Sequence, residues 1–311
     1  MRIQVFHGAS AAIALLFLTS CGQGSPPVAP AIPFAPLEDT SIKDPDNPTK
    51  VFRVDLAKVE QNYPLSRADL MKITPANLAV LSQEQIDQIY GRLSAGPIPD
   101  GPHRGDLFFA SGDSLRKRLS EVLGGIEGRI ADDKINRLER LARSLWKGKM
   151  FYREERMLRN LIEDLKPLEP IIDNVSTVMT TNVPRQSLLR FILPTDKVWL
   201  LFPAKIYCGQ SLFDSRRDSI IVDYNYSDEL PGYRASPDSL AGRGGLRIRD
   251  EIRMVRPGFY LGRAYANRLF LVNFTVYSAE VADRTAASFA AGGPVAEECW
   301  PGEQVRRAAA R

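Results

Sequence analysis

The sequence has few of the residues that most often bind metals or transfer protons. It holds three cysteines and two histidines among 311 residues. Structural zinc sites use four cysteine or histidine ligands. Beyond the N-terminal segment only Cys208, Cys299 and His103 remain. They supply too few ligands, so the sequence predicts no metal site and no cofactor.

The chain also lacks a strong excess of one charge. Its 41 basic and 37 acidic residues leave a formal charge of +4, and the two signs are interspersed, as in Asp214-Ser215-Arg216-Arg217-Asp218. Proteins that bind nucleic acids usually carry a basic stripe instead. We therefore expect no nucleic-acid partner.

No apolar run reaches the roughly 20 residues of a membrane-spanning helix. The longest useful run, 11–18, follows a lone Arg2 and leads through small residues to Cys21, which is typical of a secretory signal peptide. A retained membrane helix is the alternative. The end of the run, Leu18-Thr19-Ser20-Cys21, resembles the lipobox of bacterial lipoproteins.

That resemblance implies a signal peptide over 1–20 and lipidation of Cys21, which would anchor the protein in a membrane. Gly22 follows the cysteine, where an aspartate favours inner-membrane retention in well-studied Gram-negative families. We therefore expect a location in the bacterial cell envelope, at the outer membrane and facing the periplasm.

Proline is frequent in the next segment, 21–49. Such composition favours extended conformations and builds no core, so we interpret this segment as a tether. An ordered strap at Ile32-Pro33-Phe34, packed on the folded part, is the alternative.

Residues 50–145 show helical signals. Ser66 with Asp69 and Ser82 with Gln85 form capping boxes, and Thr74 precedes a proline at a first helical position. Further helices are expected over 115–125 and 132–145, and the pattern over 153–165 also suits a helix. His103 lies in a turn-rich stretch, which suggests an exposed loop histidine; acid–base chemistry is the alternative.

From 146 to 285 short segments rich in valine, isoleucine and aromatic residues alternate with turns, and a tail follows over 286–311. The fold class is therefore α+β: an N-terminal helical region, then an antiparallel β-meander forming a small barrel or strongly curved sheet. In an exported protein Cys208 and Cys299 can form a disulfide, worth about 4 kcal/mol. Two free thiols are the alternative.

The last hairpins predict which side chains point inward. A turn centred on Pro257-Gly258 places Ile252 opposite Arg263 and Asp250 opposite Tyr265. The next turn, Asn267-Arg268, places Phe270 and Phe274 on the same apolar side. Asp250 and Arg263 then form either an internal salt bridge that sets strand register or a site where Arg263 and Tyr265 hold the polar head of a ligand. The 227–245 loop is either a lid over the barrel mouth or a flexible insertion.

The hairpin 249–265 resembles the closing hairpin of lipocalin-like, calycin-type domains, and Trp146-Lys147-Gly148 is similar to the Trp-x-Gly element of GxWxG-type domains. The resemblance implies a small hydrophobic ligand. We predict non-catalytic binding of a small apolar or amphipathic molecule by Asp250, Arg263, Tyr265, Ile252, Phe270 and Phe274. An envelope scaffold with a solid core and a protein partner is the alternative. An enzyme using Asp250 with Tyr265 lacks an evident nucleophile.

Overall fold

The structure is a computed structural model that describes residues 27–36, 41–42, 53–111, 145–169, 172, 174–185 and 195–299. The predicted signal peptide and Cys21 lie outside these residues. So do the predicted helix over 115–125 and nearly all of the one over 132–145. Among the described residues, no helix is long and apolar enough to cross a bilayer.

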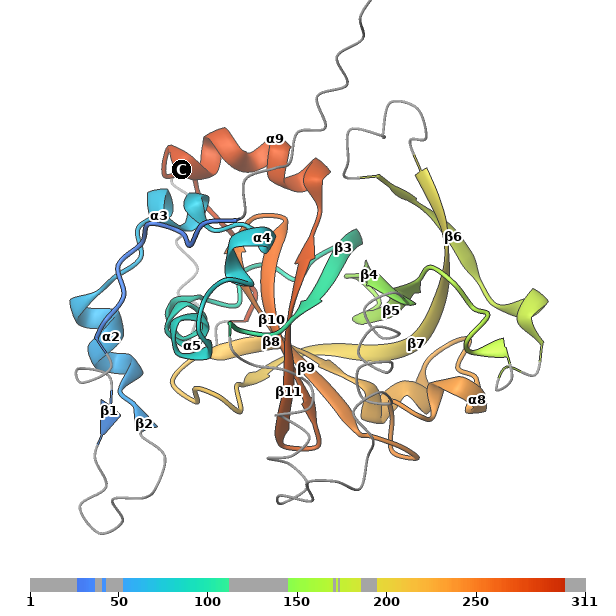
Figure 1. The fold of residues 1–311 in the computed structure, drawn as a ribbon. Coiled ribbons are helices and arrows are strands. Elements are labelled where there is room, and N and C mark those ends of the chain that lie inside the picture. The colour runs from blue at the N-terminus through green and yellow to red at the C-terminus, as the bar shows by residue number, and fades with distance from the viewer. Residues whose placement is uncertain are drawn as a thin grey trace, which may run out of the picture.

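Eight antiparallel strands close into a barrel (Figure 1). Each strand pairs with the next in the chain, except that β5 pairs with β7, and β11 closes the circle by pairing with β3. The ninth strand of the sheet, β6 (Thr180–Pro184), pairs with the first part of β7. The barrel strands are β3 (Gly101–Phe108), β4 (Trp146–Tyr152), β5 (Met157–Ile162), β7 (Thr195–Gln210), β8 (Asp218–Asp223), β9 (Ile248–Arg256), β10 (Phe259–Ala266) and β11 (Leu269–Tyr277). The predicted antiparallel barrel is confirmed.

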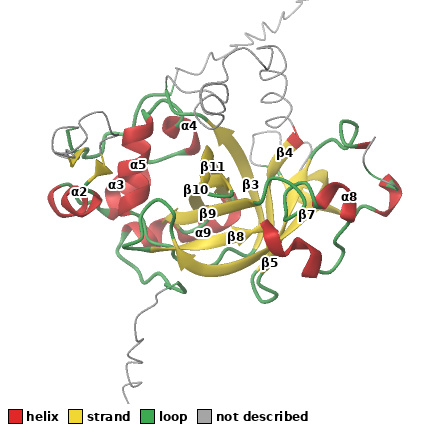
Figure 2. Ribbon diagram, turned by 90° about the horizontal axis from the view of Figure 1, so that it is seen from below, coloured by secondary structure: helices red, strands yellow, loops and turns green. Residues whose placement is uncertain are grey.

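Helices lie around this barrel. Figures 1 and 2 show α2, α3 and α5 on one side of it and α8 on the other. The predicted caps are present, with Ser66, Thr74 and Ser82 each accepting the hydrogen bond of a first-turn amide. The helical elements are α2 (Leu56–Asn62), α3 (Arg67–Lys72), α4 (Pro75–Leu78), α5 (Gln83–Arg92), η2 (Val175–Thr177), η4 (Tyr224–Glu229), α8 (Ala235–Asp238) and α9 (Ala279–Ala290). A two-stranded sheet joins β1 (Ser41–Ile42) to β2 (Arg53–Val54).

Two barrel strands lie where the sequence suggested other structure. Strand β3 lies within the region expected to be helical and includes His103, which is buried rather than exposed. The 153–165 segment contains strand β5 rather than a helix, and all six residues of β5 are buried. A strand buried on both faces lacks polar alternation, so its apolar run is easily mistaken for a helical stripe.

A β-bulge near the β9–β10 turn overturns the predicted register. The turn is where we expected it, with Arg256 opposite Phe259, but Tyr260 then pairs with Met254 and leaves Val255 as an extra residue. One extra residue moves every later side chain to the other face. Arg263 therefore lies opposite Glu251 rather than Ile252. The predicted inward orientation of Arg263 and Tyr265 is wrong.

A second bulge, between β10 and β11, places Phe270 and Phe274 on opposite faces of the sheet, although both were predicted on the same face. The pairing of Ala264 with Val272 is followed by that of Tyr265 with Phe270. Phe274 remains in the core inside the barrel, whereas Phe270 packs edge-on against Tyr265 on the outer face.

Both faces of the barrel wall are buried here. The inner core contains Ile252, Met254, Tyr260 and Phe274. A second core lies between the outer face and the helices; it includes Ile86, Ile89, Tyr90, Val255, Phe259 and Leu261. A side chain on the outer face is therefore not in water, although the alternating charges Arg249, Glu251 and Arg253 of β9 are a pattern typical of a solvent-facing side.

One end of the barrel is sealed by two chain segments, 94–98 and 295–299. Ala95 and Cys299 belong to the inner core, and the amide of Glu298 donates to the carbonyl of Gly96 at 3.5 Å. A disulfide joins Cys208 of β7 to Cys299. We call the two segments, of which 295–299 is disulfide-bonded to β7, the plug.

The opposite end is covered by the predicted lid, 227–245, which follows β8 and precedes β9. Asp238 in this loop is buried, and it accepts a hydrogen bond of 2.7 Å from the amide of Phe202. Ala241 packs against the inner core. The loop is thus a packed cover rather than a flexible insertion.

The proline-rich segment is an ordered strap where it is described. Ala35 exchanges two hydrogen bonds of 2.9 Å with the side chain of Gln88 on α5. Ile32 and Phe34 pack against the outer core. The interpretation of 21–49 as a tether is therefore wrong for 30–36, where the alternative we kept open holds.

Candidate functional site

A cluster of polar side chains lies inside the barrel. The Nζ atom of Lys149 donates hydrogen bonds of 2.8 Å to Asp250 Oδ2 and to Tyr224 Oη, and one of 3.2 Å to Asn160 Oδ1. The indole of Trp146 donates to the same Asn160 oxygen at 2.8 Å. Strands β4, β5 and β9, together with Tyr224 at the start of η4, thus bring these groups together around one ammonium. We call the five residues the inner cluster.

The inner cluster keeps its charges despite burial. Burial by itself lowers the pKa of Lys149, but attraction to Asp250 and hydrogen bonding outweigh it, so the pKa lies above its usual value. Burial raises the pKa of Tyr224 to about 12. Lysine is therefore charged and tyrosine neutral near neutral pH, and neither is prepared to exchange a proton.

Side chains of the barrel fill the space that we predicted would hold a ligand. The ring of Phe274 lies so close to Gly262 that an added Cβ there would be 2.2 Å from it. Ile252 is fully buried in the same core. Of the predicted binding residues, only Asp250, Ile252 and Phe274 face inward, and the partner of Asp250 is Lys149 rather than Arg263.

Arg263, Tyr265 and Phe270 form a separate site on the outer face. The guanidinium of Arg263 lies 4.3 Å from the ring centroids of Phe213 and Phe270 and forms an ion pair with Asp87 of α5. Tyr265 accepts a hydrogen bond of 3.0 Å from it. Asp250 and Tyr265 lie on opposite faces of the sheet, so their pairing as catalytic residues is wrong.

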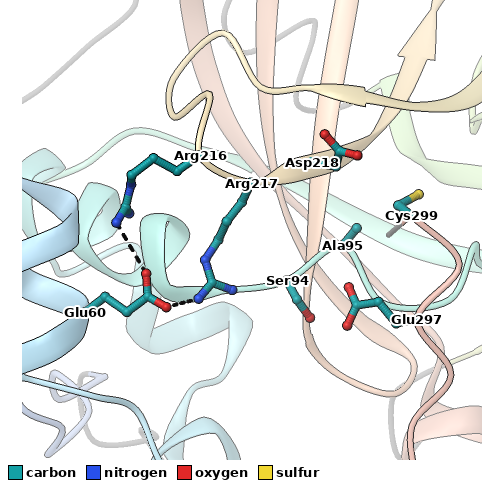
Figure 3. Close-up of a pocket in the computed structure, with 8 residues that line it drawn as sticks. All are labelled: Glu60, Ser94, Ala95, Arg216, Arg217, Asp218, Glu297 and Cys299. Atoms are coloured by element: carbon teal, nitrogen blue, oxygen red, sulfur yellow. Dashed lines mark hydrogen bonds and ion pairs between the residues drawn. The ribbon is translucent and has the colours of Figure 1, made fainter. Parts of the chain in front are cut away.

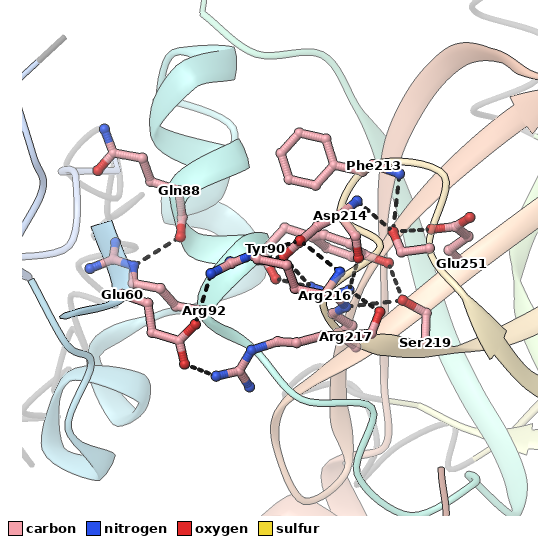
Figure 4. A network of polar contacts seen from close by, with 12 residues as sticks. Glu60, Gln88, Tyr90, Arg92, Phe213, Asp214, Arg216, Arg217, Ser219 and Glu251 are labelled. Carbon is pink, nitrogen blue, oxygen red and sulfur yellow. Dashed lines mark hydrogen bonds and ion pairs between the residues drawn. The ribbon is translucent and has the colours of Figure 1, made fainter. Parts of the chain in front are cut away.

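A second buried arginine fastens α5 to the same face, where its partners Tyr90, Asp214, Arg217 and Ser219 lie close together (Figure 4). Arg253 donates to the backbone carbonyls of Tyr90, Asp214 and Arg217 at 2.8–3.2 Å and to the hydroxyl of Ser219 at 3.0 Å. Its side chain is fully buried. We call these contacts the outer network.

A cavity of about 430 Å³ lies at the sealed end of the barrel. We call it the mouth cavity; it lies at the end of the barrel opposite to the one that the 227–245 loop covers. Its lining is mixed: Pro97, Pro99, Pro102, Pro257, Tyr260 and Val281 supply apolar surface, and Asp100, His103, Arg153, Glu280 and Arg284 supply polar groups. Tyr260 is held by a hydrogen bond of 2.7 Å to the carbonyl of Pro97. Burial lowers the pKa of His103 to about 4, so its ring is neutral at physiological pH.

A second cavity, also of about 430 Å³, lies beside α2 (Figure 3). We call it the side cleft. It is lined by Glu60, Ser94, Ala95, Arg216, Arg217, Asp218, Glu297 and Cys299. It therefore borders the plug at the same end of the barrel, and five of its eight lining residues are charged.

Lys149, the centre of the inner cluster, was not predicted from the sequence. A signal for it was present, because Lys149 has the same parity as Phe151 in a strand whose odd positions point inward. Gly148 supports this placement: its φ of +129° suits glycine, and an added Cβ would be 2.1 Å from the carbonyl of His103. The Trp-x-Gly element thus lets β3 and β4 approach closely and places Trp146 beside Lys149.

Across the described residues, no group of three histidine, cysteine, aspartate or glutamate side chains is arranged to hold a metal ion. Compared with models of protein families, with curated proteins and with solved structures, the chain shows no significant match.

Proposed function

We propose that this protein is a lipid-anchored, non-catalytic component of the bacterial envelope that binds a small amphipathic ligand in the mouth cavity. The observation that carries the proposal is the mixed lining of this cavity. Small-molecule sites are largely apolar clefts of 300–1,000 Å³ with a few polar groups that orient the ligand. The eight-stranded up-and-down barrel supports the resemblance to lipocalin-like domains, which hold such ligands.

The ligand site that we propose differs in depth from the one expected at first. The inner core and the inner cluster occupy the lumen, so the ligand would rest on the sealed end, with its apolar part against the prolines and Tyr260. Its polar head would meet Arg153 or Arg284. His103 is neutral, so it would act as a hydrogen-bonding group and not as a charge.

Anchoring through Cys21 is supported by the lipobox resemblance and by chain length. Five residues lie between Cys21 and Pro27, and the six steps from one residue to the next span at most about 20 Å. A lipid on Cys21 would therefore hold the strap side of the protein near the bilayer. Replacing Cys21 by serine should move the protein from the membrane fraction to the soluble fraction and abolish incorporation of labelled palmitate.

Native mass spectrometry of the detergent-extracted full-length protein tests ligand binding. We expect a co-purifying small molecule, and we expect Val281→Trp to displace it, because the larger side chain fills the mouth cavity. The matched control is Val80→Trp at an exposed position. A ligand that remains bound to Val281→Trp would place the site elsewhere.

A scaffold is the second candidate, and the filled lumen favours it. A solid core with an internal ion pair suits a rigid body that presents its surface to an envelope protein. If the extract carries no small molecule, and Val281→Trp behaves as the parent protein does, this candidate replaces the first.

A further inference from the structure

The side cleft has a basic side, which carries two arginines, and an acidic side, which carries two carboxylates. Figure 3 shows Arg216, Arg217 and Glu60 on one side, Asp218 and Glu297 on the other, and Ser94 between them. These residues come from four separate parts of the chain, so the fold assembles the arrangement. We ask which of these charges are already neutralised.

Arg216 is fully engaged on the basic side. Its Nε and Nη2 atoms bind the two carboxylate oxygens of Asp214 at 2.9 and 3.0 Å, and its Nη1 lies 3.4 Å from Glu60. This bidentate contact with Asp214, together with the contact to Glu60, uses all three nitrogens of the guanidinium. Arg216 therefore orients Glu60 and has little left to offer a ligand.

Arg217 has spare hydrogen-bonding capacity. It forms an ion pair with Glu60 through Nη2, and within the described part of the chain its side chain makes no other hydrogen bond. Burial and the nearby charge of Arg253 lower its pKa, and the carboxylate of Glu297 offsets only part of this effect, so a further anion in contact with the guanidinium would be favourable. Ser94, with a hydroxyl donor, lines the cleft next to it.

Among the described residues the acidic side has no cation in direct contact, and Glu297 attracts Arg217 only from across the cleft. Within the described residues, no lysine or arginine forms an ion pair with Asp218 or Glu297. Glu297 accepts one hydrogen bond of 3.3 Å from the amide of Gly96, so this contact joins the two segments of the plug. Two carboxylates facing one space favour a cation between them.

From these contacts we infer that the side cleft binds a zwitterion: an amino acid or the ends of a short peptide. Its carboxylate lies between Arg217 and Ser94, and its ammonium group lies between Asp218 and Glu297. A volume of about 430 Å³ accommodates a ligand of this size. The site is distinct from the mouth cavity, and the inference does not depend on the function proposed for that cavity.

Equilibrium dialysis of the full-length protein with radiolabelled glycylglycine tests this inference. We expect saturable binding of one molecule per chain. N-acetyl-glycylglycine lacks the ammonium group and glycylglycinamide lacks the carboxylate, so each should bind at least about tenfold more weakly, as expected when one ionic contact is lost.

Variants assign the two ends of the ligand. Arg217→Gln should remove affinity for the carboxylate end and Asp218→Asn for the ammonium end, each by about tenfold or more. Arg217→Lys keeps the charge and should retain part of the affinity. Arg243→Gln, at an exposed arginine outside the cleft, is the matched control, and a thermal melt checks that each variant is folded.

Three results would overturn the inference. One is the lack of saturable binding at millimolar glycylglycine. Another is that the two blocked dipeptides bind as tightly as glycylglycine, and the third is that Arg217→Gln and Asp218→Asn leave glycylglycine binding unchanged. Any of them would make the charged cleft a structural contact between α2 and the barrel. Val281→Trp should leave glycylglycine binding intact, which separates this result from a failure of the mouth cavity.

Discussion

The two faces of the barrel wall bury charge in different ways. Inside, Lys149 and Asp250 neutralise each other within an apolar lumen. Outside, Arg253 binds mainly backbone carbonyls of segments that are far apart in sequence. The inner pair is thus self-contained, whereas the outer arginine fastens α5 and the β7–β8 loop to the sheet. Only the first arrangement could be replaced by apolar residues at little cost elsewhere, because the other polar members of the inner cluster still hydrogen-bond one another.

The largest effect is expected from removing one partner of the inner pair. Asp250→Ala leaves the ammonium of Lys149 buried without its counter-charge, and breaking a buried pair in this way costs about 3–5 kcal/mol. Urea unfolding followed by circular dichroism measures the change in the free energy of unfolding.

The double variant Lys149→Met with Asp250→Leu is the control. It removes both charges and should recover most of the lost stability, because apolar residues of similar volume often replace a buried pair at little cost. If Asp250→Ala costs less than about 1 kcal/mol, water reaches Lys149 and the lumen is not closed.

Removing Arg253 from the outer network should cost nearly as much stability as breaking the inner pair. A second apolar substitution should not restore that stability. Arg253→Met leaves three buried carbonyls without their donor, which we expect to cost roughly 3 kcal/mol in the same urea experiment. Arg253→Lys keeps the charge, but one ammonium cannot span the carbonyls of Tyr90, Asp214 and Arg217. It should recover less than half of the loss. Full recovery would show that charge, rather than the bridging geometry, stabilises this face.

The same contrast explains what the sequence could predict. Asp250 and Ile252 were assigned correctly to the interior, because alternation along β9 is a local property. Arg263 was assigned to the wrong face, because one bulged residue, Val255, inverts the parity and leaves no local signal. Arg253 stands in a pattern of alternating charges that is typical of a solvent-facing side, yet it is buried because its partners come from segments that only the fold brings near.

Other misses have related causes. Strand β3 begins among prolines and glycines, which predict a turn, and its pairing with β11 is established only when the barrel closes. The disulfide between Cys208 and Cys299 was one of two possibilities and is formed. The two cavities could not be predicted, because each is assembled from segments distant in sequence.

His103, at the sealed end of the barrel, should make the stability of the protein depend on pH. Its pKa is about 4 in the folded protein and about 6.5 when unfolded. Between these values the unfolded chain binds more protons, so stability falls as the pH decreases. From about pH 7.5 to about pH 5 we expect a loss of about 2 kcal/mol from this group.

The variant His103→Phe isolates that contribution. A phenyl ring fits beside Phe151 and Tyr260 and does not titrate, so the slope of stability against pH should flatten between about pH 5 and pH 6.5. Thermal melts across this range measure it. An unchanged slope would assign the acid sensitivity to other groups.

The smallest effect on stability is expected at Glu60, where the outer side meets the side cleft. Glu60 is about one-third exposed, and ion pairs in such positions contribute up to about 1 kcal/mol. Glu60→Gln should therefore barely change urea unfolding. The same substitution removes the carboxylate that occupies Arg217, so a ligand carboxylate meets less competition and glycylglycine should bind more tightly. If instead Glu60→Gln weakens the protein as much as Arg253→Met does and binding does not increase, the arginine pair serves to hold α2 against the barrel.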